Sequence, residues 1–324
     1  MASAINSTTD KISSPDLKTH LEIRYNIKIS RITQLDHNVF KVDRHDGPSW
    51  VARVFDPSLP TKIVEGDAET LRFLEQHNFP AERCANVEPL STITDGRHVL
   101  VTDFVEGRRP RKGEQLFPKL GELLGRLHSL ETDNTGAVAR RGGAWHHLCP
   151  EGGPKEEVQA ALAMLKVAEQ SVQADQLEMY EKLKSKLEEM DDFEDLPRTF
   201  IHPDLVPPNV ITANSGDLVV IDWAGSGTGP RIASLGFLLS AAGHRSMAQV
   251  KAVAEGYSKH VSLRDEELAR LAGAVERPFV LRCWEFCTGR TKLEDVVGGI
   301  SQMEELADRI AAVTCKVFRD GGGH

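Results

Sequence analysis

The chain has 324 residues and a formal net charge of −9, with 40% hydrophobic and 27% charged residues. This composition is ordinary for a soluble globular protein, and the length suits two lobes or one large domain. The acidic balance argues against nucleic acid or an anionic membrane surface as the main partner, because both require a basic patch.

Membrane and secretion signals are missing from the sequence. No apolar run approaches the roughly 18 residues of a membrane span. The N-terminal stretch MASAINSTTDKISS lacks the charged-then-apolar order of a signal peptide. The five cysteines include no C-x-x-C pair, and we interpret them as reduced, mostly buried thiols. We therefore predict a cytoplasmic protein.

The first third of the chain is rich in strand patterns. Residues 1–15 are small and polar, which predicts a flexible tail. Strands are predicted at 29–35, 37–44 and 50–55, a helix at 64–79, and a further strand at 98–107. We expect residues 16–106 to form a small strand-rich lobe, followed by a connector at 107–113.

Beyond the connector the pattern becomes helical. Leucines at helical spacing predict a helix at 114–130. Residues 155–190 predict one long helix or two joined near 171–175, and further helices are expected at 247–260, 264–277 and 301–315. We expect residues 107–324 to form a larger, mainly helical lobe that is interrupted at 199–223. The predicted fold class is α+β.

The interruption, IHPDLVPPNVITANSGDLVVIDWAG (201–225), has the pattern of a β-hairpin around NSGD. A turn centred between Ser215 and Gly216 places Asn209 opposite Asp222 at the open end of the hairpin. Opposed Cβ atoms lie about 4.5–5.5 Å apart. Carboxylate and amide oxygens are the hard ligands that Mg²⁺ prefers, so this pair predicts a metal site.

Asp204 lies in the proline-rich loop before the hairpin and cannot pair within it. A carboxylate beside a metal-bound phosphate can accept the proton of an attacking hydroxyl. His202, two residues earlier, is interpreted either as a hydrogen-bonding support of this loop or as an ordinary partly buried histidine.

The motif HPDLVPPN followed by VVIDW resembles the H-x-D-x4-N…D signature of the aminoglycoside phosphotransferase and choline kinase-like families. These families share the two-lobed protein-kinase-like fold. The resemblance implies that Asp204 is the catalytic base and that Asn209 and Asp222 are magnesium ligands. It also implies that the backbone from Thr102 to Val105 is the hinge for the nucleotide base, with Asp103 more suited to tethering the hinge than to binding ligand.

The resemblance also implies a basic residue on the third strand with an acidic partner on the following helix. The basic residue is Arg53, which suits phosphate. The acid is Asp67 or, as alternatives, Glu69 or Glu65. The phosphate-covering turn, at His37 and Asn38, has no glycine where relatives often have a pair, and Ala233-Ser234 stands where many relatives have an aspartate.

The acceptor site is expected in the second lobe. Its candidates are Trp145, in the unusual loop RRGGAWHHLCPEGG (140–153), and Trp284 with the adjacent Glu285. Each has an alternative interpretation as core packing, and the acidic run Asp265–Glu267 is better explained by favourable charge at a helix start.

These residues together predict an ATP- and Mg²⁺-dependent kinase of a small-molecule hydroxyl acceptor, with GTP as a possible donor. Two other classes stay open. One is a catalytically silent nucleotide-binding pseudokinase that acts as a sensor or scaffold. The other is a metal-dependent hydrolase built on His202, Asp204 and Asp222.

Overall fold

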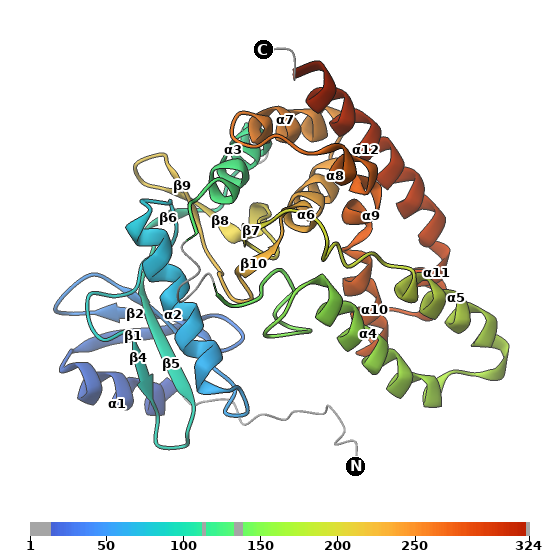
Figure 1. Cartoon of the computed structure of the whole chain (residues 1–324). Coiled ribbons are helices and arrows are strands. Elements are labelled where there is room, and N and C mark those ends of the chain that lie inside the picture. The colour runs from blue at the N-terminus through green and yellow to red at the C-terminus, as the bar shows by residue number, and fades with distance from the viewer. Residues whose placement is uncertain (1–13, 112–114, 133–138, 322–324) are drawn as a thin grey trace. The chain divides into compact units, whose positions relative to one another are not determined.

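The computed structural model describes residues 14–111, 115–132 and 139–321, and its chain divides into two compact units (Figure 1). The first unit comprises the described residues up to Arg108 together with Ile211–Ile221. The second comprises the described residues of Arg109–Val210 and those from Asp222 onward. The hairpin segment Ile211–Ile221, which lies within the expected larger lobe of 107–324, groups with the first unit. The predicted tail at 1–15 lies almost wholly outside the described residues.

The first unit is built on a five-stranded sheet in which every neighbouring pair is antiparallel. Its strands, in spatial order, are β1 (Ile29–Asp36), β2 (Val39–Arg44), β3 (Trp50–Val54), β5 (His98–Asp103) and β4 (Leu90–Thr92). Helix α2 (Thr61–Gln76) packs against β5. The predicted strands and helix are present, and the strand predicted at 98–107 ends at Asp103.

Helix α1 (Ser14–Tyr25) was not predicted. Leu17 and Leu21, one helical turn apart, are fully buried in the core of the sheet, whereas Ile23 is 78% exposed. Two inward-facing leucines in a polar segment give too weak a periodicity to predict a helix. Only the packing of these side chains on the strands makes the helix evident.

The turn between β1 and β2 contains no glycine, and Asn38 supplies its left-handed residue. Asn38 adopts a left-handed conformation with φ of 55°. Asparagine tolerates this region better than other non-glycine residues do. Its carbonyl also accepts the Val54 N–H at 2.8 Å, which ties the turn to the end of β3.

A three-stranded sheet contains the hairpin of the sequence motif, with strand order β6 (Gly107–Arg108), β8 (Val210–Ala213) and β9 (Leu218–Val220). The Ala213 N–H donates to the Asp217 carbonyl at 2.8 Å, and the Gly216 N–H donates to the Ala213 carbonyl at 2.9 Å. The turn therefore has three residues, with Gly216 at φ of 93°, as in a bulged hairpin. The predicted register, which assumed a two-residue turn, is wrong by one residue, and Asn209 and Asp222 lie outside the ladder.

The second unit is mainly helical (Figure 1). Helix α3 (Leu116–His128) packs along α7 (Met247–Ser258), and α6 (Arg231–Gly243) packs on α9 (Leu271–Glu276). The remaining helices are α4 (Pro154–Ala168), α5 (Leu177–Glu188), α8 (Asp265–Ala269), α10 (Phe279–Cys287), α11 (Leu293–Gly298) and α12 (Ile300–Gly321). Segment 155–190 therefore forms two helices, and the helix predicted at 264–277 is divided into α8 and α9. None of the helices in these ranges is long and apolar enough to cross a bilayer.

Two short antiparallel strands frame the loop that carries Asp204. Strand β7 (Arg198–Ile201) directly precedes the loop. Strand β10 (Gly227–Pro230) pairs with β7 from Ile201↔Gly227 to Arg198↔Pro230. Since α6 begins at Arg231, directly after β10, the loop is anchored to the buried helix α6 as well.

Candidate functional site

The Asp204 loop is closed by its own residues. Pro207–Asn209 form a 3₁₀ turn immediately before β8. The side-chain amide of Asn209 donates to the Asp204 carbonyl at 3.1 Å. The amide nitrogen of Asn209 is thus used to hold the loop. Asn209 combines loop closure with the capacity to offer an oxygen ligand.

His202 supports the backbone of Asp204. Its ring is fully buried, and its Nδ1 accepts the Asp204 N–H at 3.1 Å. The same nitrogen lies 3.5 Å from Oδ1 of Asp204, but it already acts as an acceptor for the amide, so this second contact is not an ion pair. Trp223 packs edge-on against the imidazole with ring centroids 4.7 Å apart. These contacts are those expected of a residue that orients the loop.

Ser234 binds the other side of His202. The Ser234 hydroxyl, 1% exposed on α6, donates to the His202 carbonyl at 2.6 Å. In the sequence this position stands out only because many relatives carry an aspartate nearby. The structure shows that the serine makes a direct contact with the loop. A serine offers a donor to a carbonyl, whereas an ionised carboxylate could only accept.

Asp222 follows β9 in a left-handed conformation with φ of 67°. Such a backbone is costly for a residue with a side chain, and residues held in it cluster at functional sites. Gly225, with φ of 76°, follows closely, and a Cβ built on it would lie 2.8 Å from the Ala144 carbonyl oxygen and 3.6 Å from Cγ of Pro203. The chain downstream of Asp222 therefore packs closely on both the Asp204 loop and the segment around Ala144.

The phosphate-binding candidates lie on the first unit. Arg53 is on β3, where it pairs with Val39 of β2 and Leu100 of β5. Asp67 is 6% exposed on the buried face of α2, whereas Glu69 is exposed. A buried carboxylate requires a partner, whereas an exposed one is solvated. The burial pattern thus separates Asp67 from Glu69.

The hinge candidates lie at the end of β5 and just beyond it. Asp103 is the last residue of this strand, is paired with Trp50 of β3, and donates its N–H to the Arg83 carbonyl at 2.9 Å. Burial and the nearby Glu75 raise the pKa of its carboxyl. Val105 lies two residues beyond the strand and is half-buried.

Within the second unit, the structure brings together two of the acceptor candidates that are distant in sequence. The rings of Trp145 and Trp284 meet edge to face with centroids 5.0 Å apart. His147 packs on Trp145 at 4.8 Å, and the guanidinium of Arg290 lies 4.2 Å from the centroid of the Trp284 ring. We call Trp145, His147, Trp284 and Arg290 the aromatic group. Its two tryptophans are half-buried, and His147 and Arg290 are exposed.

A buried ion pair that the sequence does not indicate supports Trp145. Glu157 and Arg277 are 3% and 4% exposed and lie 2.5 Å apart. Glu157 also accepts the Trp145 N–H at 2.7 Å, and Arg277 donates to the Gly143 carbonyl at 3.0 Å. The pair therefore fixes the loop from both sides. Nothing in the sequence indicates that these two residues meet, because 120 positions separate them.

Two of the acidic candidates for a cationic acceptor, Glu285 and Glu267, are paired with arginines. Glu285 is paired with Arg282 on α10. Glu267, fully buried, receives two hydrogen bonds from Arg231 at 2.8 and 2.7 Å. Glu267 is thus a structural residue rather than an acceptor ligand.

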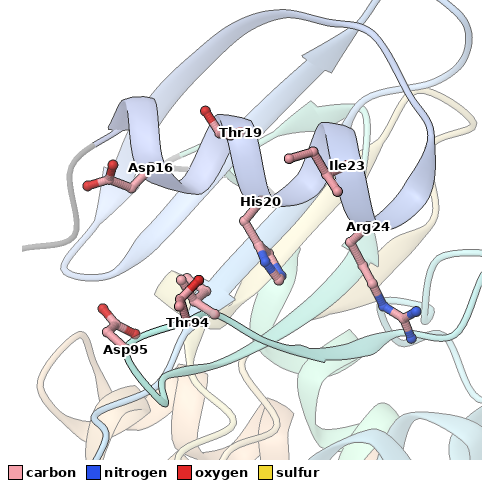
Figure 2. Close-up of a pocket in the computed structure, with 8 residues that line it drawn as sticks. Asp16, Thr19, His20, Ile23, Arg24, Thr94 and Asp95 are labelled. Atoms are coloured by element: carbon pink, nitrogen blue, oxygen red, sulfur yellow. The ribbon is translucent and has the colours of Figure 1, made fainter.

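A cavity of about 580 Å³ lies in the first unit between α1 and the turn that follows β4. Figure 2 shows Asp16 and Asp95 at one end, Arg24 at the other and His20 between them. His20 Nε2 contacts the Ser91 hydroxyl at 2.9 Å. None of the predicted site residues lines this cavity.

Comparison with known proteins identifies the family. The profile of the Phosphotransferase enzyme family matches residues 28–273, which include β1 to β3, the Asp204 loop and Asp222. The chain belongs to this family. The match covers both the phosphate-binding candidates and the catalytic candidates of this phosphotransferase.

Individual relatives are more distant. A homoserine kinase from Zymomonas mobilis is 27% identical over 215 residues, and the match covers 59% of each chain. The phosphotransferase thus aligns with about three fifths of the length of that curated relative. Among solved structures, amicoumacin kinase hAmiN has a TM-score of 0.64 at 17% identity, covering 91% of this chain and 94% of its own. Choline kinase LicA from Streptococcus pneumoniae has a TM-score of 0.60 at 14% identity, covering 93% and 100%. The predicted kinase-like fold is thereby confirmed.

Proposed function

We propose that this phosphotransferase transfers the γ-phosphate of ATP to a hydroxyl group of a small molecule, with Asp204 as the catalytic base. The observation that carries the proposal is the construction of the Asp204 loop. His202, Asn209 and Ser234 fix its backbone through separate hydrogen bonds, while the Asp204 side chain keeps 14% of its surface exposed. A positioned, accessible carboxylate suits acceptance of the proton of an attacking hydroxyl.

Asn209 and Asp222 fit a magnesium ion. The amide oxygen of Asn209 and the carboxylate of Asp222 are hard oxygen donors, and Mg²⁺ favours one or two protein ligands with phosphates and waters. The left-handed backbone of Asp222 supports a functional role for this residue. A bound Mg²⁺ would neutralise the charge of the transferring phosphoryl group.

Arg53, Asp67 and the hinge backbone are proposed to hold the nucleotide. Arg53 would contact the phosphates, and the buried carboxylate of Asp67, rather than that of the exposed Glu69, would orient its guanidinium. Around Val105, which lies beyond the end of β5, backbone groups would bind the base. Asp103 would tether this segment to Arg83 through its backbone.

The acceptor site is proposed at the loop that carries Trp145. A Cβ at Gly225 would lie 3.4 Å from Cβ of His146 and 3.6 Å from Cγ of Pro203. His146 therefore lies near the residue that precedes Asp204. The relatives act, by name, on homoserine, amicoumacin and choline, so an alcohol of a small molecule is the shared acceptor class.

The test compares wild type with Asp204→Asn and Asp222→Ala. We expect thermal melts to show a stabilisation by ATP that depends on Mg²⁺, is retained in Asp204→Asn and is weakened in Asp222→Ala. Release of ADP with hydroxylated acceptors should fall by about 10²- to 10⁴-fold in Asp204→Asn, the usual contribution of a general base. Normal turnover in that variant would refute the assignment of the base. Mg²⁺-dependent binding without turnover on any acceptor would favour the pseudokinase alternative.

A further inference from the structure

The aromatic group carries a cation without a carboxylate partner. Arg290 is exposed, its guanidinium lies 4.2 Å from the centroid of the Trp284 ring, and it forms no ion pair with any residue in the described ranges. Stacking on the ring restrains the planar guanidinium while its N–H groups stay available. The other arginines of this region, Arg277 and Arg282, are each paired with a glutamate. Arg290 is therefore the cation in this group that a ligand could engage.

The same surroundings disfavour a positively charged acceptor. Such a ligand would need a carboxylate or the face of an aromatic ring. The Glu285 carboxylate is paired with Arg282, the Glu157 carboxylate is buried against Arg277, and a cation already lies over Trp284. A second cation here would meet repulsion from Arg290 without a matching anion.

The position of the group relative to Asp204 follows from contacts within the second unit. Trp145 lies between Ala144 and His146, both of which adjoin Gly225, and Gly225 adjoins Pro203. The Trp145 ring contacts the Trp284 ring, and Arg290 lies over the Trp284 ring. A series of contacts therefore runs from the Asp204 loop through Gly225 to the segment that carries Trp145, and from Trp145 to Trp284 and Arg290. The half-buried Trp145 ring, which meets the Trp284 ring at a near-perpendicular angle of 86°, offers a ligand an apolar surface.

We infer that the acceptor is a hydroxylated carboxylic acid with a flat apolar body, whose carboxylate binds Arg290 and whose body lies against Trp145. The inference rests on the proposed function for the orientation of the hydroxyl toward Asp204. A single unpaired guanidinium matches a single negative charge and can bind a carboxylate through two parallel hydrogen bonds. The acceptor class is thus anionic, in contrast to a polycationic or quaternary ammonium acceptor.

Three benzyl alcohols of the same shape test the charge preference. They carry a carboxylate, an alcohol or an ammonium group at the para position: 4-(hydroxymethyl)benzoate, 1,4-benzenedimethanol and 4-(aminomethyl)benzyl alcohol. Binding is measured by calorimetry or ligand-observed NMR, and phosphoryl transfer by release of ADP. We expect the carboxylate to bind about tenfold more tightly than the neutral diol, the gain typical of a charged hydrogen bond, and the amine to bind more weakly than the diol.

Arg290→Gln should abolish the preference for the carboxylate while leaving the affinity for the diol and for ATP unchanged. Arg24→Gln is the matched control, because it removes an exposed arginine that also stacks on an aromatic ring, Tyr25, in the first unit. It should bind all three alcohols as wild type does. A carboxylate that binds no better than the diol, or a preference that survives Arg290→Gln, would overturn the inference, as would failure of all three alcohols to bind.

The failure of the proposed function would look different. Binding of the carboxylate through Arg290 without release of ADP by wild type would leave the acceptor inference standing and count against Asp204 as a base. Turnover of the diol or the amine in preference to the carboxylate would support the kinase assignment and overturn the acceptor class. Asp204→Asn should retain the binding preference and lose turnover.

Discussion

Ser234→Ala removes the hydroxyl that binds the His202 carbonyl at 2.6 Å. Both residues are buried, at 1% and 0% exposure, so water cannot readily replace the lost donor. Leaving a buried acceptor short of a partner costs about 1–3 kcal/mol of unfolding free energy. Alanine is the better helix former by a few tenths of a kcal/mol, about 0.5 at most, which offsets part of this loss.

Ser240→Ala provides the matched control. Ser240 lies on the same helix, is 7% exposed, and its hydroxyl forms no hydrogen bond with the described residues. The helix-propensity gain is the same in both variants, so their difference isolates the hydrogen bond. We expect Ser234→Ala to unfold in urea with about 1–3 kcal/mol less free energy than Ser240→Ala. At about 2–4 °C per kcal/mol for a unit of this size, the melting temperatures should differ by several degrees.

The kinetic effect distinguishes positioning from stability. If the Ser234 contact positions Asp204 through His202, kcat should fall by about tenfold to a hundredfold in Ser234→Ala, the scale of a small misplacement of a catalytic group. The affinity for ATP should stay unchanged, and Ser240→Ala should keep the wild-type kcat. Equal stability of the two variants would refute the hydrogen-bond argument. A stability loss with normal kcat would refute the positioning argument.

Three further predictions concern burial, pH and backbone conformation. Glu157→Gln leaves the charge of Arg277 buried without its partner, and should lower the free energy of urea unfolding by about 3–5 kcal/mol. Burial lowers the pKa of His128 from its ordinary 6.5 to about 3. Between these two pH values the unfolded chain therefore binds a proton that the folded chain does not bind. Stability should therefore fall by up to about 1.4 kcal/mol per pH unit as the pH drops below about 6.5 toward 3, and His128→Asn should flatten this slope in urea titrations at several pH values. Gly225→Ala should lower the melting temperature more than Gly216→Ala, since both glycines have positive φ but only the Cβ at Gly225 would meet a carbonyl oxygen at 2.8 Å.

Each of these predictions has a contradicting result. Loss of one partner from a buried ion pair usually costs about 3–5 kcal/mol of unfolding free energy. If Glu157→Gln unfolds within about 1 kcal/mol of wild type, the Arg277 charge is not left buried without a partner. If the unfolding free energy of His128→Asn depends on pH as in wild type, groups other than His128 cause that dependence. If Gly225→Ala and Gly216→Ala lower the melting temperature equally, the close contact at Gly225 costs nothing. The whole loss is then the conformational cost of a positive φ, about 1–2 kcal/mol.

Local patterns were enough to predict much of this protein. Alternating strands at 29–44 and 50–55, a helix with its inner leucines before Phe79, and leucines at helical spacing after 114 were confirmed because short-range periodicity decides such elements. The motif around Asp204 indicated the family because its residue types and spacing are dictated by the chemistry of phosphoryl transfer.

Contacts between distant segments decided the rest. The burial of Leu17 and Leu21 on the sheet produced helix α1, and the three-residue turn at Gly216 shifted the hairpin register by one residue. Trp145 meets Trp284, and Glu157 meets Arg277, only because α4 and α10 pack together. Such pairs depend on tertiary packing, for which the periodicity of a single sequence carries no signal. The sequence by itself therefore indicated the kinase-like fold and the phosphotransferase family, and the tertiary structure decided which distant side chains contact one another and which charges are paired.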